Sequence, residues 1–116
     1  MLKKRGVMVS IGAHCQQQGL ATHREMWSFV RGGFSAIEAL QAATIVPARH
    51  LGFDQDLGSL EVGKLADSLV MDTNPLEEIT NTDKVSMVMI NGRLYEAATM
   101  NEVYSSDNKL PAYFWE

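Results

Sequence analysis

Asp56-Leu-Gly-Ser-Leu-Glu-Val-Gly-Lys-Leu-Ala-Asp67, followed by the apolar run Ser68-Leu-Val-Met-Asp72, carries the strongest structural signal in this chain. Two glycines, Gly58 and Gly63, stand five residues apart in it, and each precedes a polar residue and then an apolar one. Glycine accepts backbone angles that other residues avoid, so this pattern indicates turns that join short strands.

Strand-like segments continue on both sides of these turns. The predicted strands are Leu57–Leu60, Leu65–Asp72 and Lys84–Ile90. Asn91-Gly92 then stands before Arg93-Leu-Tyr95, and this dipeptide favours a type I′ turn because both of its residues tolerate positive φ. We therefore expect an antiparallel hairpin at this point of a small sheet.

Before residue 54 the apolar spacing is helical instead. It predicts a first helix at His23–Arg31 and a second one that starts at Ser35. Ser35 and Glu38 form a capping box, in which each side chain accepts from the other residue's backbone amide. Pro47–Leu51 is predicted to be a short third helix that ends at Gly52.

The amino-terminal segment predicts a buried strand at Val7–Gly12, because it is a short apolar run with β-branched residues. Lys3-Lys4-Arg5 before it resembles the start of a secretory signal, but the apolar part is too short and Ser10 interrupts it. The single cysteine, Cys15, excludes an internal disulfide and leaves the cellular compartment open.

These patterns divide the chain into three parts: a strand and helices at 1–54, a sheet segment at 55–99 and a tail at 100–116. The tail ends in the apolar cluster Leu110–Trp115, which we expect to dock onto another surface.

Composition limits the class of protein. Hydrophobic residues make up 46% and charged residues 21% of 116 residues, values that are ordinary for a globular domain and argue against disorder or a membrane protein. Ten basic and fourteen acidic residues give a net charge of -4, which argues against a nucleic-acid partner. A chain of this length buries roughly two-thirds of its unfolded surface, so we expect one compact unit or a unit completed by a partner.

Residues 56–72 resemble the signature G-S-[IL]-x-x-G-K-x-A-D-[LF]-[VA]-[VL]-x-D of the amidohydrolase superfamily, which opens the small β-sandwich after the catalytic barrel. Ser35–Gly52 is similar to the family's helices T-P-x-E-A-L-x-A-A-T-x-x-x-A-x-x-L-G, Gly6–Gly12 to its eighth barrel strand, and Val85–Tyr95 to its sandwich strands. The resemblance, to the imidazolonepropionase-like branch, implies an α+β chain. It would hold the last β/α unit of a TIM barrel plus helices, followed by the small antiparallel portion of a β-sandwich, with an Asn-Gly hairpin.

The chemistry that this resemblance implies is metal-assisted hydrolysis of a carbon-nitrogen bond in a small-molecule substrate, with a divalent metal, zinc foremost, that lowers the pKa of a water. A complete (β/α)8 barrel takes about 250 residues, so 116 residues cannot form one. The family's His-x-His pair and other ligands belong to upstream barrel segments, and no His-x-His occurs among His14, His23 and His50.

His14 is the main candidate for a catalytic role and for metal binding. Gly12-Ala13-His14 occupies the position where the family's eighth strand ends in an aspartate that contacts the metal and takes a proton from water. The alternative is a histidine that bonds a loop carbonyl. His23 is a second candidate metal ligand, with a neutral polar role at a helix start as its alternative. We assign no chemistry to Cys15 or His50.

The leading interpretation is a carboxy-terminal fragment of a metal-dependent amidohydrolase that acts on carbon-nitrogen bonds other than peptide bonds. It would be inactive alone and would need the missing amino-terminal barrel portion as its partner. One alternative is a non-catalytic oligomerising module, a homodimer formed through strand Val7–Ile11, the helices or the aromatic tail, with no metal in this chain. Another is a protein that binds a small ligand in the loop His14–Gly19.

Overall fold

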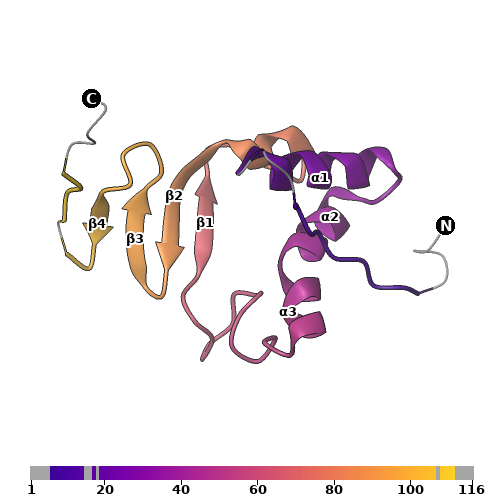
Figure 1. Cartoon of the computed structure of the whole chain (residues 1–116), viewed down its shortest axis with the longest axis horizontal. Helices are drawn as coiled ribbons and strands as arrows, with labels where there is room; N and C mark the ends of the chain where they lie inside the picture. Colours follow the sequence, from indigo (N-terminus) through magenta and orange to yellow (C-terminus); the bar gives the residue numbers. More distant parts are fainter. Residues whose placement is uncertain (1–5, 15–16, 18, 107, 112–116) are drawn as a thin grey trace.

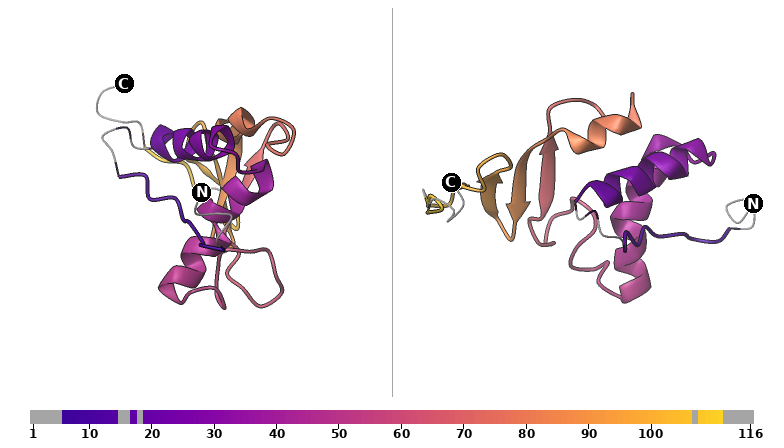
Figure 2. Two further views of the ribbon diagram at one scale, coloured as in Figure 1. Left: turned by 90° about the vertical axis from the view of Figure 1, so that its right-hand side faces the viewer. Right: turned by 45° about the horizontal axis from the view of Figure 1, so that its top comes forward.

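The computed structural model describes residues 6–14, 17, 19–106 and 108–111. In this part of the chain three α-helices come first, and four strands with a 3-10 helix follow (Figure 1). The helices gather at one end of the molecule and the sheet lies beside them (Figure 2). The predicted α+β mixture of helices and antiparallel sheet is therefore confirmed. No helix in the described residues has the length and apolar character needed to cross a membrane.

Helix α1 (Leu20–Arg31) begins three residues before the predicted start. Gly19, with φ of 79°, turns the chain into the helix, and the backbone amide of Ala21 donates to the carbonyl of Gln17 at 3.0 Å. The helix ends before Gly32, as the sequence predicted.

Helices α2 (Ala36–Ala43) and α3 (Ile45–Leu51) follow closely. The capping box predicted for α2 is present: Ser35 Oγ accepts from the Glu38 amide at 3.4 Å, and Glu38 Oε2 accepts from the Ser35 amide at 2.8 Å. Helix α3 begins two residues before Pro47, which stays in the first turn, where its missing N–H costs no helical hydrogen bond.

The strand predicted at Val7–Gly12 is not formed. Within the described residues this segment is extended but has no strand beside it, so it lacks the ladder of hydrogen bonds that defines a strand. Its contact is with a helix instead, because the Ile11 amide donates to the Ala42 carbonyl in α2 at 2.9 Å. The barrel strand of the predicted fold is thus represented by an unpaired extended segment.

The sheet contains four antiparallel strands in the order β1-β2-β3-β4. The strands are β1 (Ser68–Met71), β2 (Val85–Ile90), β3 (Arg93–Glu96) and β4 (Glu102–Tyr104). Asn91 and Gly92, with φ of 48° and 78°, join β2 to β3, and Ile90 pairs with Arg93 across the turn. All described strands belong to this one sheet, so they form a single layer. A β-sandwich needs a second sheet, so the predicted sandwich portion stays a prediction.

The predicted strand Leu57–Leu60 is also absent, and this segment forms bends. Gly58, with φ of 93°, lies so close to α3 that a Cβ on it would stand 2.8 Å from the Ala48 Cβ. Lys64 closes the loop, because its Nζ donates to the Asp54 carbonyl at 2.6 Å and to Ser59 Oγ at 2.6 Å. This loop therefore packs against a helix instead of pairing in the sheet.

The hydrophobic core lies among the helices. Met26 of α1, Ala39 of α2 and Ile79 of the 3-10 helix η2 (Ile79–Asp83) are buried together. The 3-10 helix η2 thus belongs to the connection between β1 and β2, and it packs on α1.

The start of the predicted tail joins the sheet as β4. Glu102 is 2% exposed, and its carboxylate accepts from Arg93 Nε at 3.0 Å and from Arg93 Nη2 at 2.5 Å. Asn108 Nδ2 also donates to Glu102, at 3.2 Å. The hydrogen bond from Arg93, despite burial, lowers the pKa of Glu102 to about 2. The aromatic end of the predicted cluster Leu110–Trp115 lies outside the described residues.

Candidate functional site

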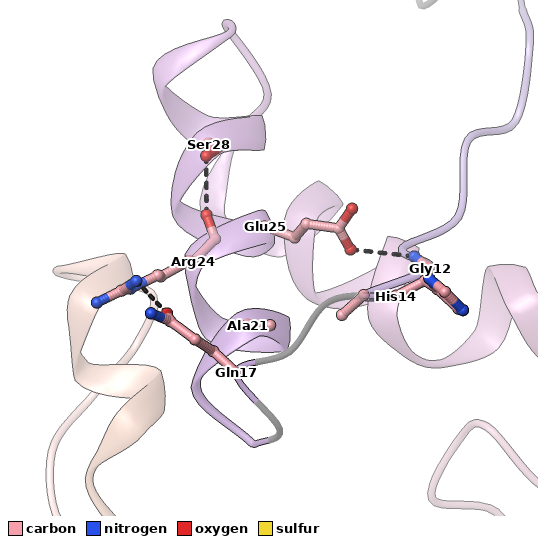
Figure 3. A pocket seen from close by; sticks show the side chains of 8 residues that line it. Gly12, His14, Gln17, Ala21, Arg24, Glu25 and Ser28 are labelled. Carbon is pink, nitrogen blue, oxygen red and sulfur yellow. Dashed lines mark hydrogen bonds between the residues drawn. The ribbon is translucent and has the colours of Figure 1, made fainter.

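A pocket of about 370 Å³ opens between the extended amino-terminal segment and the first turns of α1 (Figure 3). Its volume is in the range of small-molecule sites. The lining consists of small and polar residues: Gly12, Ala13, His14, Gln17, Ala21, Arg24, Glu25 and Ser28. The residue predicted to be catalytic therefore lies at the wall of a pocket.

His14 reaches the pocket from the segment that precedes α1, and its side chain is exposed. No hydrogen bond joins its ring to another described residue, and residues 15, 16 and 18 of the loop lie outside the described ranges. An accessible imidazole can accept a proton or bind a metal through a neutral ring nitrogen. The roles assigned to His14 stay predictions, and its position is compatible with them.

Two neighbouring charged residues of α1 reach opposite sides of the pocket (Figure 3). Glu25 Oε2 accepts from the backbone amide of Gly12 at 3.0 Å, and the Arg24 guanidinium donates to the side-chain oxygen of Gln17. Ser28 Oγ donates to the Arg24 carbonyl one turn earlier, at 2.8 Å. The pocket thus combines a carboxylate, a guanidinium and an imidazole, which are groups that bind polar molecules and transfer protons.

His23 lies elsewhere on α1 and does not line the pocket. It precedes Trp27 by one helical turn, and Trp27 Nε1 donates to Thr82 Oγ1 of η2 at 3.0 Å. The Nδ1 atom of His23 is buried and has no hydrogen-bond partner among the described residues. His14 therefore lines the pocket, and His23 does not.

The described residues do not fit a complete metal centre. A structural zinc site uses four protein ligands and a catalytic one usually three. No group of three or more His, Cys, Asp or Glu residues in the described ranges could hold a metal ion. Cys15 lies outside those ranges. A metal bound near His14 would therefore need ligands from outside this set.

Sequence reasoning missed Glu25 and Arg24. The spacing of Ala21, Glu25 and Ser28, four and then three residues, places small and polar residues on one face of α1, and this stripe was the available signal. The contacts of Glu25 with Gly12 and of Arg24 with Gln17 depend on how the segment before the helix folds back. His50, to which no chemistry was assigned, lies away from the pocket, with Nδ1 3.2 Å from Ser10 Oγ.

Comparison with protein families matches residues 1–95 to the model of the Amidohydrolase family. A protein described as "Probable imidazolonepropionase" from Xenopus tropicalis is 32% identical over 118 residues, which cover 92% of this chain and 25% of that protein. An imidazolonepropionase from Symbiobacterium thermophilum is 51% identical over 41 residues, which cover 35% of this chain and 10% of that protein.

A solved structure of a Xaa-Pro dipeptidase with methionine bound in its active site resembles this fold with a TM-score of 0.75 and 35% sequence identity. The likeness covers 82% of this chain and 24% of the dipeptidase chain. The chain thus spans about a quarter, or less, of the length of the proteins that it matches.

Proposed function

We propose a function from one premise: the chain belongs to the amidohydrolase family, whose model matches residues 1–95. It is a hydrolase fragment of this family. We propose that it forms the carboxy-terminal portion of a metal-dependent enzyme that hydrolyses carbon-nitrogen bonds in small molecules, and that it is inactive alone. The observation that carries the proposal is the match of nearly the whole chain to about a quarter of a related protein.

In this proposal His14 is the contribution of the chain to the catalytic centre. It acts as a metal ligand or as a general base, and its exposure at the pocket supports access to a substrate. The remaining metal ligands come from a barrel portion that this chain does not span. Zinc is the proposed metal, and it would supply an activated water when bound. His23, with its buried and unpartnered Nδ1, is the second candidate ligand.

One relative is an imidazolonepropionase and one structural neighbour is a Xaa-Pro dipeptidase, so the relatives differ in substrate. The expectation of a bond other than a peptide bond is therefore one arm of the test rather than a premise.

A second candidate function is a non-catalytic oligomerising module, and the sheet supports it. Two large apolar side chains on the same face of the sheet are exposed, at 52% for Leu69 and 57% for Ile90. A single-layer sheet normally buries at least one face against another layer. A homodimer formed through this sheet, or docking of the missing barrel portion, would cover these side chains.

The first experiment measures metal content by plasma mass spectrometry and molecular mass by light scattering on the purified chain, with hydrolysis assays on amide and dipeptide substrates. The proposed fragment has no turnover alone and gains it when co-expressed with a reading frame that encodes the His-x-His barrel portion. His14→Ala should lower the regained turnover, whereas His50→Ala, which changes a histidine outside the pocket, should not.

Stoichiometric metal and turnover in the chain alone would refute the proposed inactivity. A stable dimer that never gains activity with the barrel portion would favour the oligomerising module, and a monomer at working concentration would exclude that module.

A further inference from the structure

The segment that carries His14 is attached to α1 at two points, one on each side of the histidine. Two residues before His14, the amide of Gly12 donates to Glu25 Oε2 at 3.0 Å. Three residues after it, the side chain of Gln17 accepts from Arg24. Because Glu25 and Arg24 are neighbours, one turn of α1 holds both ends of the segment (Figure 3).

Helix α1, which carries these two contacts, is itself held in place by packing and a buried hydrogen bond. Met26, the next residue after Glu25, is 5% exposed and packs in the core with Ile79. Trp27 donates to Thr82, which is fully buried, at 3.0 Å. The residues that follow Glu25 are therefore fixed by packing on one side of α1, while its carboxylate extends to the other side.

From this arrangement we propose that Glu25 is a positioning residue for His14. Its carboxylate binds a backbone amide, and a hydrogen bond with one ionised partner is shorter and stronger than a neutral one. Fixing the Gly12 amide limits the backbone angles that orient the next two residues, and so limits where the His14 imidazole lies over the pocket. Arg24 binds the other end through the side chain of Gln17 and not through the backbone, so it constrains the backbone next to His14 less directly.

The importance of this role for catalysis rests on the proposed function of His14. The test, however, uses the chain alone and no substrate. Failure of the hydrolase proposal would therefore show in turnover assays, and failure of the positioning proposal would show in NMR spectra of the chain.

The experiment compares the chain with Glu25→Ala, Glu25→Gln and Glu25→Asp by NMR. Water exchange of the Gly12 amide and the ring carbon-proton signal of His14 are the two readouts. Loss of the hydrogen bond in Glu25→Ala should raise the exchange rate of Gly12 about fivefold or more and shift the His14 ring signal. Glu25→Gln keeps an acceptor oxygen at the same reach and should restore both readouts.

Arg31→Ala is the matched control, since Arg31 is an exposed cation at the far end of the same helix. It should leave Gly12 and His14 unchanged, and the His50 ring signal should stay constant in every variant. If Glu25→Ala does not fold, Glu25→Asp gives the same test, because its carboxylate is one methylene too short to reach Gly12.

Unchanged Gly12 exchange and an unchanged His14 signal in the folded alanine or aspartate variant would overturn the proposal. Changes spread over the whole chain, with no restoration by glutamine, would also overturn it, because they would mean a general structural role for Glu25.

Discussion

Replacing Gly58 by alanine should destabilise the chain far more than the same change at Gly63. Both glycines have strongly positive φ, 93° and 95°, so the backbone strain of an added Cβ is nearly the same at the two positions. They differ in their surroundings. A Cβ on Gly58 would stand 2.8 Å from Ala48 Cβ and 3.1 Å from Ile45 Cα, whereas a Cβ on Gly63 meets nothing within 4 Å.

The expected magnitudes follow from these contacts. A left-handed backbone conformation costs an L-residue roughly 1–2 kcal/mol, which is the full expected loss for Gly63→Ala. Gly58→Ala adds an overpacking cost of about 1–3 kcal/mol. The overpacking cannot be relieved cheaply, because Ala48 is 3% exposed and its Cβ is fixed to the backbone of α3. The total expected loss for Gly58→Ala is therefore about 2–5 kcal/mol.

Urea unfolding followed by circular dichroism at helical wavelengths measures both free energies. The double variant Gly58→Ala with Ala48→Gly completes a mutant cycle, in which removing the Ala48 methyl group should recover part of the overpacking cost. Equal losses for Gly58→Ala and Gly63→Ala, or no coupling between positions 58 and 48, would show that the loop does not pack on α3 as described.

Three further outcomes are expected. The folded pKa of Glu102 is about 2, below the ordinary 4.5, so its ionised form contributes stability that is complete above pH 4.5 and is lost as the pH falls toward 2. Glu102→Gln should flatten this part of a plot of urea midpoint against pH, and an unchanged slope would contradict the assignment. Thr82→Val should cost about 1–3 kcal/mol in urea unfolding, because Thr82 Oγ1 accepts from Trp27 and donates to the Ile79 carbonyl at 3.0 Å; a neutral result would mean that these bonds add nothing. Ser35→Ala should cost about 1 kcal/mol by loss of the capping box, and helical circular dichroism that melts at an unchanged midpoint would argue against it.

Features that depend on near neighbours in the chain could be predicted from the sequence. The start of α2 was predictable because Ser35 and Glu38 satisfy each other's amides within three residues. The turn at Asn91-Gly92 follows from the positive φ that both residues adopt. In contrast, Leu57–Leu60 looks strand-like by its side chains, but its conformation is set by the approach of Gly58 to α3, which local spacing does not contain.

The candidate site shows the same limit. The sequence could place His14 after an apolar segment, and the structure places it at a pocket. It could not show that Val7–Gly12 remains unpaired, since strand pairing depends on residues far away in the chain. Nor could it show that Glu25 accepts a hydrogen bond from the Gly12 amide. That contact exists only once the segment before α1 has folded back on the helix.

The 3-10 helix η2 connects two strands of the sheet and packs on α1, and α1 in turn lines the pocket. The chain leaves β1, places Ile79 and Thr82 against α1, and only then returns to the sheet as β2. Without η2 between these two strands, the face of α1 that carries Trp27 would lose its packing partner. The opposite side of α1 presents Glu25 to the segment of His14. The pocket thus depends on η2, which follows residues 56–67 in the chain, as well as on the residues that line the pocket. Removing the sheet segment should therefore loosen the support of the pocket, although no strand residue touches it.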